Sequence, residues 1–199
     1  MKKRKVAIYE GHMIGVIKTF TDCVIPIIAT LMILEVPLPI ALGHGNYSWS
    51  ETLTALIIFF VSFLVVVGFY FEFVKFFAKI KKISGWHIFA YCIFMMLLSL
   101  FPFMTQVESG NHPGIFIVFY IVYVVFISRF SLGIMKSVYR LNDVAMNVKR
   151  WNFHWDTTVM AIIAIGFGWI GLSNLTGLVM VYLPVKTLIQ TIVFDEEED

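Results

Sequence analysis

Charge is scarce in this sequence: only 14% of its 199 residues are Asp, Glu, Lys or Arg, whereas 59% are hydrophobic. Soluble domains usually carry about 25% charged residues and about half apolar ones. A soluble fold of this length would leave much of its apolar surface in water, so the composition indicates a membrane protein. At roughly 20 residues for each span, the chain has room for about six transmembrane helices.

The groups that carry enzyme chemistry are also few. Cys23 and Cys92 lie inside apolar runs, without the spacing of metal ligands, and the five histidines are scattered along the chain. Neither a glycine-rich phosphate loop nor a nucleophile motif is present. The net charge of +2 is too small to indicate a nucleic-acid partner. We therefore expect no enzymatic activity, no metal site and no cofactor.

The apolar runs predict an all-α integral membrane protein made of a single domain, residues 1–194, followed by an acidic tail, residues 195–199. The spans are expected at residues 13–34, 53–74, 87–105, 114–134, 157–172 and 175–194. Only Ser173 and Asn174 separate the last two runs. A tight helical hairpin is the favoured interpretation there, and one long kinked helix is the alternative.

Basic residues alternate between loops, and this alternation predicts the orientation. Lys and Arg gather before the first span, at residues 75–82 and at residues 136–150, whereas residues 35–52 and 106–113 contain neither. Cytoplasmic loops are the ones enriched in Lys and Arg. Both termini are therefore expected in the cytoplasm, which agrees with an even number of spans.

Ionisable side chains inside a bilayer are costly and draw attention to the first span. Lys18 and Asp22 are one helical turn apart and can pair, whereas Glu72 lies near the inner end of the second span. Lys18 and Glu72 have stems long enough to reach the interface, but Asp22 does not. For Asp22, a structural polar contact and a functional role both remain open.

An apolar stripe follows in the same span. Ile27, Leu31 and Leu34 recur at helical spacing, and Thr30 lies beside them. Such a stripe is commonly ordinary helix packing. In an oligomer whose first spans surround an axis, it would instead form apolar rings, which can gate a pore by dewetting.

The segment Phe20-Thr21-Asp22, followed by an Ile- and Leu-rich helix that closes with Leu34-Glu35, resembles a family signature. It is similar to the first helix of the transmembrane protein 175 family of potassium channels, marked by Arg-x-x-x-Phe-Ser-Asp. Further similarity, through the second and third spans, extends over roughly residues 12–106.

The resemblance implies a homotetrameric, potassium-permeable leak channel of the bacterial type, located in the plasma membrane, with six helices per subunit. It also implies that the first helix lines the pore, with Ile27 at the constriction, Leu31 and Leu34 continuing the lining and Thr30 adjacent. Its partners would be further copies of the chain, the lipid bilayer and K⁺ ions.

The sequence departs from the family pattern at several positions. Val16 occupies the arginine position, Thr21 that of the serine, and Phe71 and Glu72 follow Tyr70 where the family has histidines. In the family, such groups brace the pore helix. We therefore expect a rewired bracing network, formed by Phe20, Thr21, Asp22, Lys18, Tyr70 and Glu72.

Two other functions remain as alternatives. A secondary transporter would have a polar site around Asp22 within one subunit. A non-conducting structural membrane protein would have neither such a site nor a pore.

Overall fold

The structure is a computed structural model, and it describes residues 2–43, 46–108 and 113–144, together with the isolated positions 159, 162, 166 and 185. The predicted fifth and sixth spans, residues 157–172 and 175–194, lie outside the described ranges apart from those isolated positions. The acidic tail, residues 195–199, lies outside them entirely.

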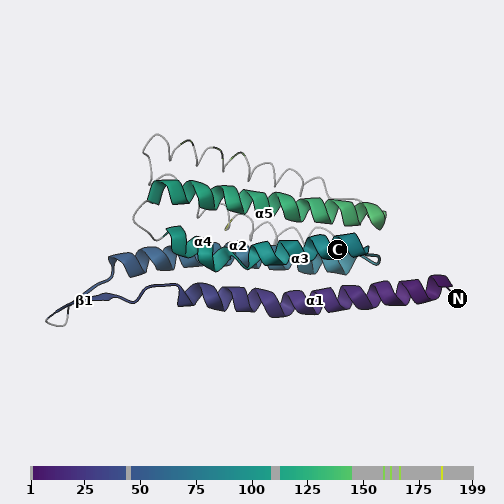
Figure 1. Ribbon diagram of the computed structural model, residues 1–199, viewed down its shortest axis with the longest axis horizontal. Coiled ribbons are helices and arrows are strands. Elements are labelled where there is room, and N and C mark those ends of the chain that lie inside the picture. The colour runs from purple at the N-terminus through teal and green to yellow at the C-terminus, as the bar shows by residue number, and fades with distance from the viewer. Residues whose placement is uncertain are drawn as a thin grey trace.

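The described ranges form a bundle of helices. The helices are α1 (Lys2–Leu34), α2 (Ser50–Lys79), α3 (Gly85–Leu98), α4 (Phe101–Glu108) and α5 (Pro113–Leu141). Figure 1 shows α1, α2 and α5 running along the long axis of the molecule, with α3 and α4 following one another between α1 and α5. Four segments are long and apolar enough to cross a membrane: Gly11–Leu34, Ser50–Lys79, Gly85–Thr105 and Val118–Leu141. These segments confirm the helical fold class and agree with the first four predicted spans.

The third predicted span, residues 87–105, falls within the candidate span Gly85–Thr105 but is divided between two helices. The structure ends α3 at Leu98 and begins α4 at Phe101. Pro102 has no N–H to donate, and its ring clashes with the carbonyl group four residues earlier in a continuous helix. The break exposes the Leu97 carbonyl oxygen, which accepts bonds from the Leu100 N–H and the Tyr123 hydroxyl.

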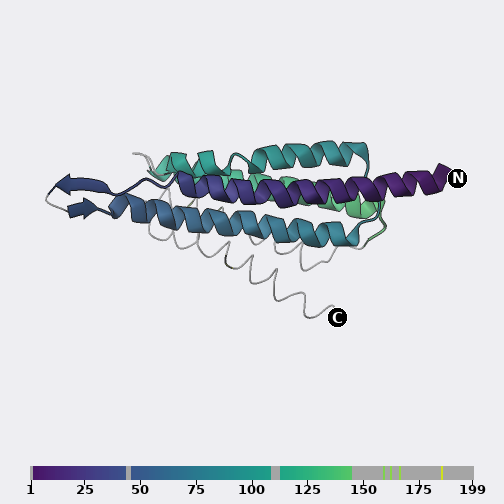
Figure 2. The ribbon, with the colours of Figure 1, turned by 90° about the horizontal axis from the view of Figure 1, so that it is seen from below.

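The segment between α1 and α2 contains a β-hairpin that hydropathy did not predict. Strands β1 (Ile40–Gly43) and β2 (Asn46–Ser48) pair antiparallel, with Ile40 opposite Ser48 and Ala41 opposite Tyr47. Figure 2 shows that this hairpin projects beyond the end of the bundle, at the opposite end from the N-terminus.

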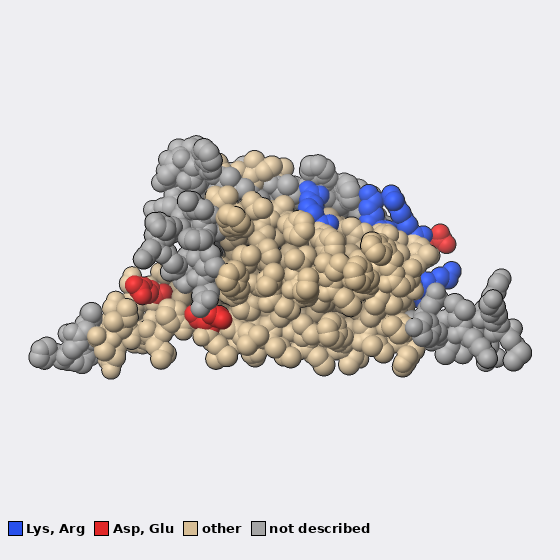
Figure 3. Space-filling model, in the orientation of Figure 1, with Lys and Arg blue, Asp and Glu red and all other residues tan. Residues whose placement is uncertain are grey.

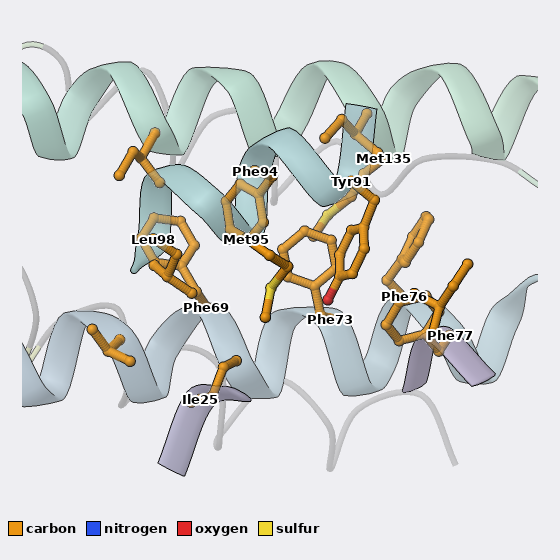
Figure 4. Packing of buried hydrophobic residues seen from close by; sticks show 14 of the residues in the cluster. Ile25, Phe69, Phe73, Phe76, Phe77, Tyr91, Phe94, Met95, Leu98 and Met135 are labelled. Atoms are coloured by element: carbon orange, nitrogen blue, oxygen red, sulfur yellow. The ribbon is translucent and has the colours of Figure 1, made fainter. Parts of the chain in front are cut away.

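An aromatic cluster forms the centre of the core where α2 meets α3. Phe73 is fully buried, and its ring centroid lies 4.8 Å from that of Phe94 and 5.0 Å from that of Tyr91. Figure 4 shows these rings interleaved between the two helices, with Met135 of α5 on the far side. Edge-on and offset ring contacts of this kind add stability beyond simple burial. The cluster therefore gives α2 and α3 a fixed relative position.

The basic residues lie toward one end of the bundle. Lys79, Lys81 and Lys82 are at the end of α2 and the turn after it, and Arg140 is in the last turn of α5. On the face in Figure 3, Lys and Arg lie toward the end where α1 begins, and acidic side chains lie mainly toward the hairpin. The charge asymmetry of the loops is thus an asymmetry of the folded bundle.

Asn142 joins two of these basic segments. Its Oδ1 accepts bonds from the Lys81 N–H at 2.8 Å and the Lys82 N–H at 2.7 Å. Its Nδ2 donates to the Lys82 carbonyl at 2.8 Å and to the Val138 carbonyl at 2.9 Å. One side chain therefore fastens the turn between α2 and α3 to the end of α5.

Candidate functional site

The first helix has two faces with different surroundings. Five residues at spacings of three and four are buried against the other helices: Ile17, Thr21, Ile25, Ile28 and Met32. Such spacing places side chains on one side of a helix. In Figure 1 α1 lies along one edge of the described bundle, and in Figure 2, which is seen from below, it lies between α2 on one side and α3 and α4 on the other. The opposite side of α1 is therefore a surface of the described part of the chain.

The stripe predicted to line a pore lies on that surface. Ile27 is 56% exposed, Leu31 46% and Leu34 77%. Thr30 is also exposed, and its hydroxyl donates to the Ile27 carbonyl at 2.8 Å. Phe20, predicted to belong to the bracing network, is 48% exposed instead of packed into the core. The described part of the subunit leaves these side chains available to lipid or to another polypeptide.

Thr21 belongs to the buried face and has two partners. Its hydroxyl donates to the Ile17 carbonyl at 2.8 Å, and its Oγ1 lies 2.5 Å from the Tyr91 hydroxyl. Tyr91 is 2% exposed and sits in the aromatic cluster, where its ring packs on Phe73 and Phe77. This contact links α1 to α3.

Asp22 lies next to Thr21 and has a partner on a different helix. The Tyr70 side chain of α2 lies close enough to the exposed Asp22 carboxylate for the two to interact. A phenol and a carboxylate are a donor and an acceptor that suit one another, and a bond to a charged group is stronger than a neutral one. Asp22 and Tyr70, both predicted members of the network, are thus brought together.

The other two predicted members are placed differently. Lys18 is exposed on α1, whereas Glu72 is half-buried on α2. That Lys18 or Glu72 pairs within a cluster around Asp22 stays a prediction, and the structure places Tyr70 close to Asp22.

Tyr91 is the residue of this region that sequence reasoning missed. It lies in the middle of an apolar run, where nothing in the sequence distinguishes it from the other aromatic residues of the span. One signal was available: a buried tyrosine hydroxyl needs a hydrogen-bond partner. The sequence contained no indication that this partner is Thr21, 70 positions earlier.

Two further features bear on alternative chemistry. Among the described residues, no group of three or more His, Cys, Asp or Glu side chains is arranged to hold a metal ion. A small cleft, with a volume of only about 10 Å³ open to water, lies between α1, α2 and α4 and is lined by Met32, Glu35, Val36, Ala55, Ile58, Phe59 and Thr105. Glu35 is 13 residues beyond Asp22 on the chain, so this cleft is not a polar site around Asp22.

Two comparisons with known proteins agree on one family. A model of the family described as the endosomal/lysosomal potassium channel TMEM175 matches residues 16–102. The fold matches the crystal structure of a lysosomal potassium-selective channel TMEM175 homolog from Chamaesiphon minutus with a TM-score of 0.72. That match has 16% sequence identity and covers 90% of this chain and 98% of the other. No curated protein matches the chain.

The family match begins at Val16 and includes the Phe20-Thr21-Asp22 segment, Tyr70 and Tyr91. The resemblance predicted from the first helix is therefore confirmed.

Proposed function

Because its residues 16–102 match the model of the TMEM175 family of potassium channels, we propose that the chain is a member of this family and forms a homotetrameric, potassium-permeable leak channel. In this proposal each subunit has six transmembrane helices, and α1 of each of the four copies faces a central axis. Ile27 forms the narrowest ring, and Leu31 and Leu34 continue the lining beside Thr30.

The position of α1 in the subunit is the observation that carries this proposal. Of the four candidate spans among the described residues, Gly11–Leu34 has the lowest mean hydropathy, and 28% of its apolar stretch is buried, against 39%, 39% and 50% for the others. A span that faces lipid over most of its surface is expected to be the more apolar one. The least apolar span is here the least buried, which is expected when its outer face meets other subunits and a water-filled path.

The side chains on that face suit a hydrophobic constriction. Ile27 and Leu34 are seven residues apart, so they lie almost in line along the helix, two turns from one another. Rings of such residues around an axis exclude water when narrow and admit a hydrated path when they widen. K⁺ would cross this barrier passively, and no cofactor is required.

The surrounding membrane and the orientation follow from the charges. The end of the bundle that carries Lys79, Lys81, Lys82 and Arg140 is placed in the cytoplasm, together with both termini. Because the solved relative comes from Chamaesiphon minutus, we place the channel in the plasma membrane of a bacterium.

The alternative functions make different demands on Asp22. A transporter with its site at Asp22 needs that carboxylate free to bind and release an ion or substrate. The interaction of Asp22 with Tyr70 favours a bracing role instead. A non-conducting structural protein would tolerate polar substitutions on the exposed face of α1 without any change in ion flux.

The test is K⁺ flux in liposomes that contain the purified chain, with Ile27→Asn as the variant and Ile57→Asn as its matched control. Ile57 is 59% exposed on α2 and lies seven residues from the start of that helix, as Ile27 lies seven residues before the end of α1. We expect flux from the wild type, increased flux from Ile27→Asn because a polar ring wets more easily, and wild-type flux from Ile57→Asn. Absence of flux from both the wild type and Ile27→Asn would overturn the proposal.

A further inference from the structure

We propose that Tyr91 is a positioning residue for the pore helix: its hydroxyl holds Thr21 and thereby sets the rotation of α1 and the direction in which Ile27 points. The consequence for ion flow rests on the proposed function, but the positioning of α1 does not.

The direction of the Thr21–Tyr91 bond follows from counting protons. A threonine hydroxyl has one proton, and that of Thr21 goes to the Ile17 carbonyl at 2.8 Å. Tyr91 must therefore donate to Thr21 Oγ1 across the 2.5 Å contact. Thr21 accepts this bond while its own proton points to the Ile17 carbonyl of α1, so the two bonds together select one rotamer of Thr21.

Tyr91 is held firmly enough to act as a reference point. Its ring centroid lies 5.0 Å from that of Phe73 and 5.6 Å from that of Phe77, both on α2. In Figure 4 its hydroxyl oxygen points away from α5. A buried aromatic residue with neighbours on several sides has few alternative rotamers. The hydroxyl therefore marks a fixed point on α3 against which α1 is placed.

A second contact at the next residue supports this restraint. Asp22 is about 100° further around α1 than Thr21 and interacts with Tyr70 on α2. The Thr21–Tyr91 bond alone would let the helix pivot about its contact. An interaction from the adjacent residue to a different helix opposes that pivot.

This restraint lies close to a weak point of the helix. Pro26 lies inside α1 and has no N–H, so the usual backbone bond to the Asp22 carbonyl is missing. Ile27 follows directly, about 9 Å along the axis from Thr21. The side-chain bond between Thr21 and Tyr91 therefore holds the helix just before the segment whose orientation matters for a pore.

The native cysteines allow a direct test that needs no ion flow. Cys23 on α1 is two residues from Thr21, Cys92 on α3 follows Tyr91, and both are exposed. Spin labels on these two thiols, with labelled chains diluted into unlabelled ones, report the distance between α1 and α3 within one copy. Tyr91→Phe and Thr21→Val each remove the contact while nearly preserving shape.

Two controls accompany these variants. Thr21→Ser keeps the hydroxyl. Tyr120→Phe removes a comparable buried contact, 2.7 Å to Ser62, that joins α2 to α5 and does not involve α1.

We expect one narrow distance distribution for the wild type, Thr21→Ser and Tyr120→Phe. Tyr91→Phe and Thr21→Val should broaden or shift it, and the double variant should change it no further. Potassium flux should change about threefold in the same two variants, the population shift expected from an interhelical bond of ordinary strength in a membrane. Unchanged distributions in both single variants would overturn the positioning role. If the distributions change in the two variants but the wild type conducts no K⁺, the positioning role of Tyr91 is retained and the proposed channel function is rejected.

Discussion

The hydroxyl oxygens of Thr21 and Tyr91 lie 2.5 Å apart, although 70 positions separate the two residues in the chain. Asp22, the next residue, interacts with Tyr70 of α2. The first helix therefore meets phenol groups on two neighbouring helices.

The interaction between Asp22 and Tyr70 should contribute measurably to stability. Tyr70→Phe removes the hydroxyl and keeps the ring, and we expect the free energy of unfolding in detergent to fall by about 1 kcal/mol. Lys18→Gln should have a smaller effect, because Lys18 is exposed and Tyr70 is the group that lies close to Asp22. Thermal or denaturant unfolding of the two variants decides between them: a larger loss from Lys18→Gln would favour the pairing predicted from sequence.

Phe73 should be the most sensitive position of the core. Its ring is fully buried and packs on Phe76, Phe77, Tyr91 and Phe94. Phe73→Ala leaves a cavity in this cluster, with an expected cost of about 3 kcal/mol or more. Phe71, two positions earlier and 40% exposed, is the matched control, and Phe71→Ala should cost about 0.5 kcal/mol. Equal losses in an unfolding experiment would contradict the packing described for α2.

The Asn142 side chain should stabilise the basic end of the bundle. Asn142→Ala removes four hydrogen bonds to backbone groups, and we expect a loss of about 1–2 kcal/mol, limited by the partial exposure of the site. Asn142→Asp keeps the acceptor for the N–H groups of Lys81 and Lys82 and loses both donated bonds, so it should fall between Ala and the wild type. Hydrogen exchange of the Lys81 and Lys82 amides measures the loss of these bonds directly. Faster exchange is expected in Asn142→Ala, and unchanged exchange would show that Asn142 does not hold this turn.

The sequence was sufficient to predict the first four spans and the family, because these depend on local properties. Long apolar runs determine where helices can cross a bilayer, and the Phe20-Thr21-Asp22 segment is contiguous. The side on which Ile27 lies also followed from helical periodicity, although periodicity alone does not distinguish a buried stripe from an exposed one.

The features that were missed depend on contacts between distant segments or on competing local effects. Tyr91 was overlooked because its partner is set by how α1 packs on α3. The break before Phe101 required Pro102 to outweigh a strong apolar run. The hairpin of β1 and β2 contains only seven strand residues, too few for a clear alternating pattern.

Disulfide cross-linking at residue 27 tests most directly whether first helices of separate copies meet. In a chain carrying Cys23→Ser and Cys92→Ser, Ile27→Cys is oxidised in membrane vesicles beside Ile57→Cys, whose side chain is similarly exposed on α2. A disulfide needs Cα atoms within about 7 Å of one another, a distance reached at a narrow constriction. We predict covalent dimers of Ile27→Cys and monomers of Ile57→Cys. Monomers of Ile27→Cys under conditions that oxidise a free thiol would contradict the pore-lining role of the first helix.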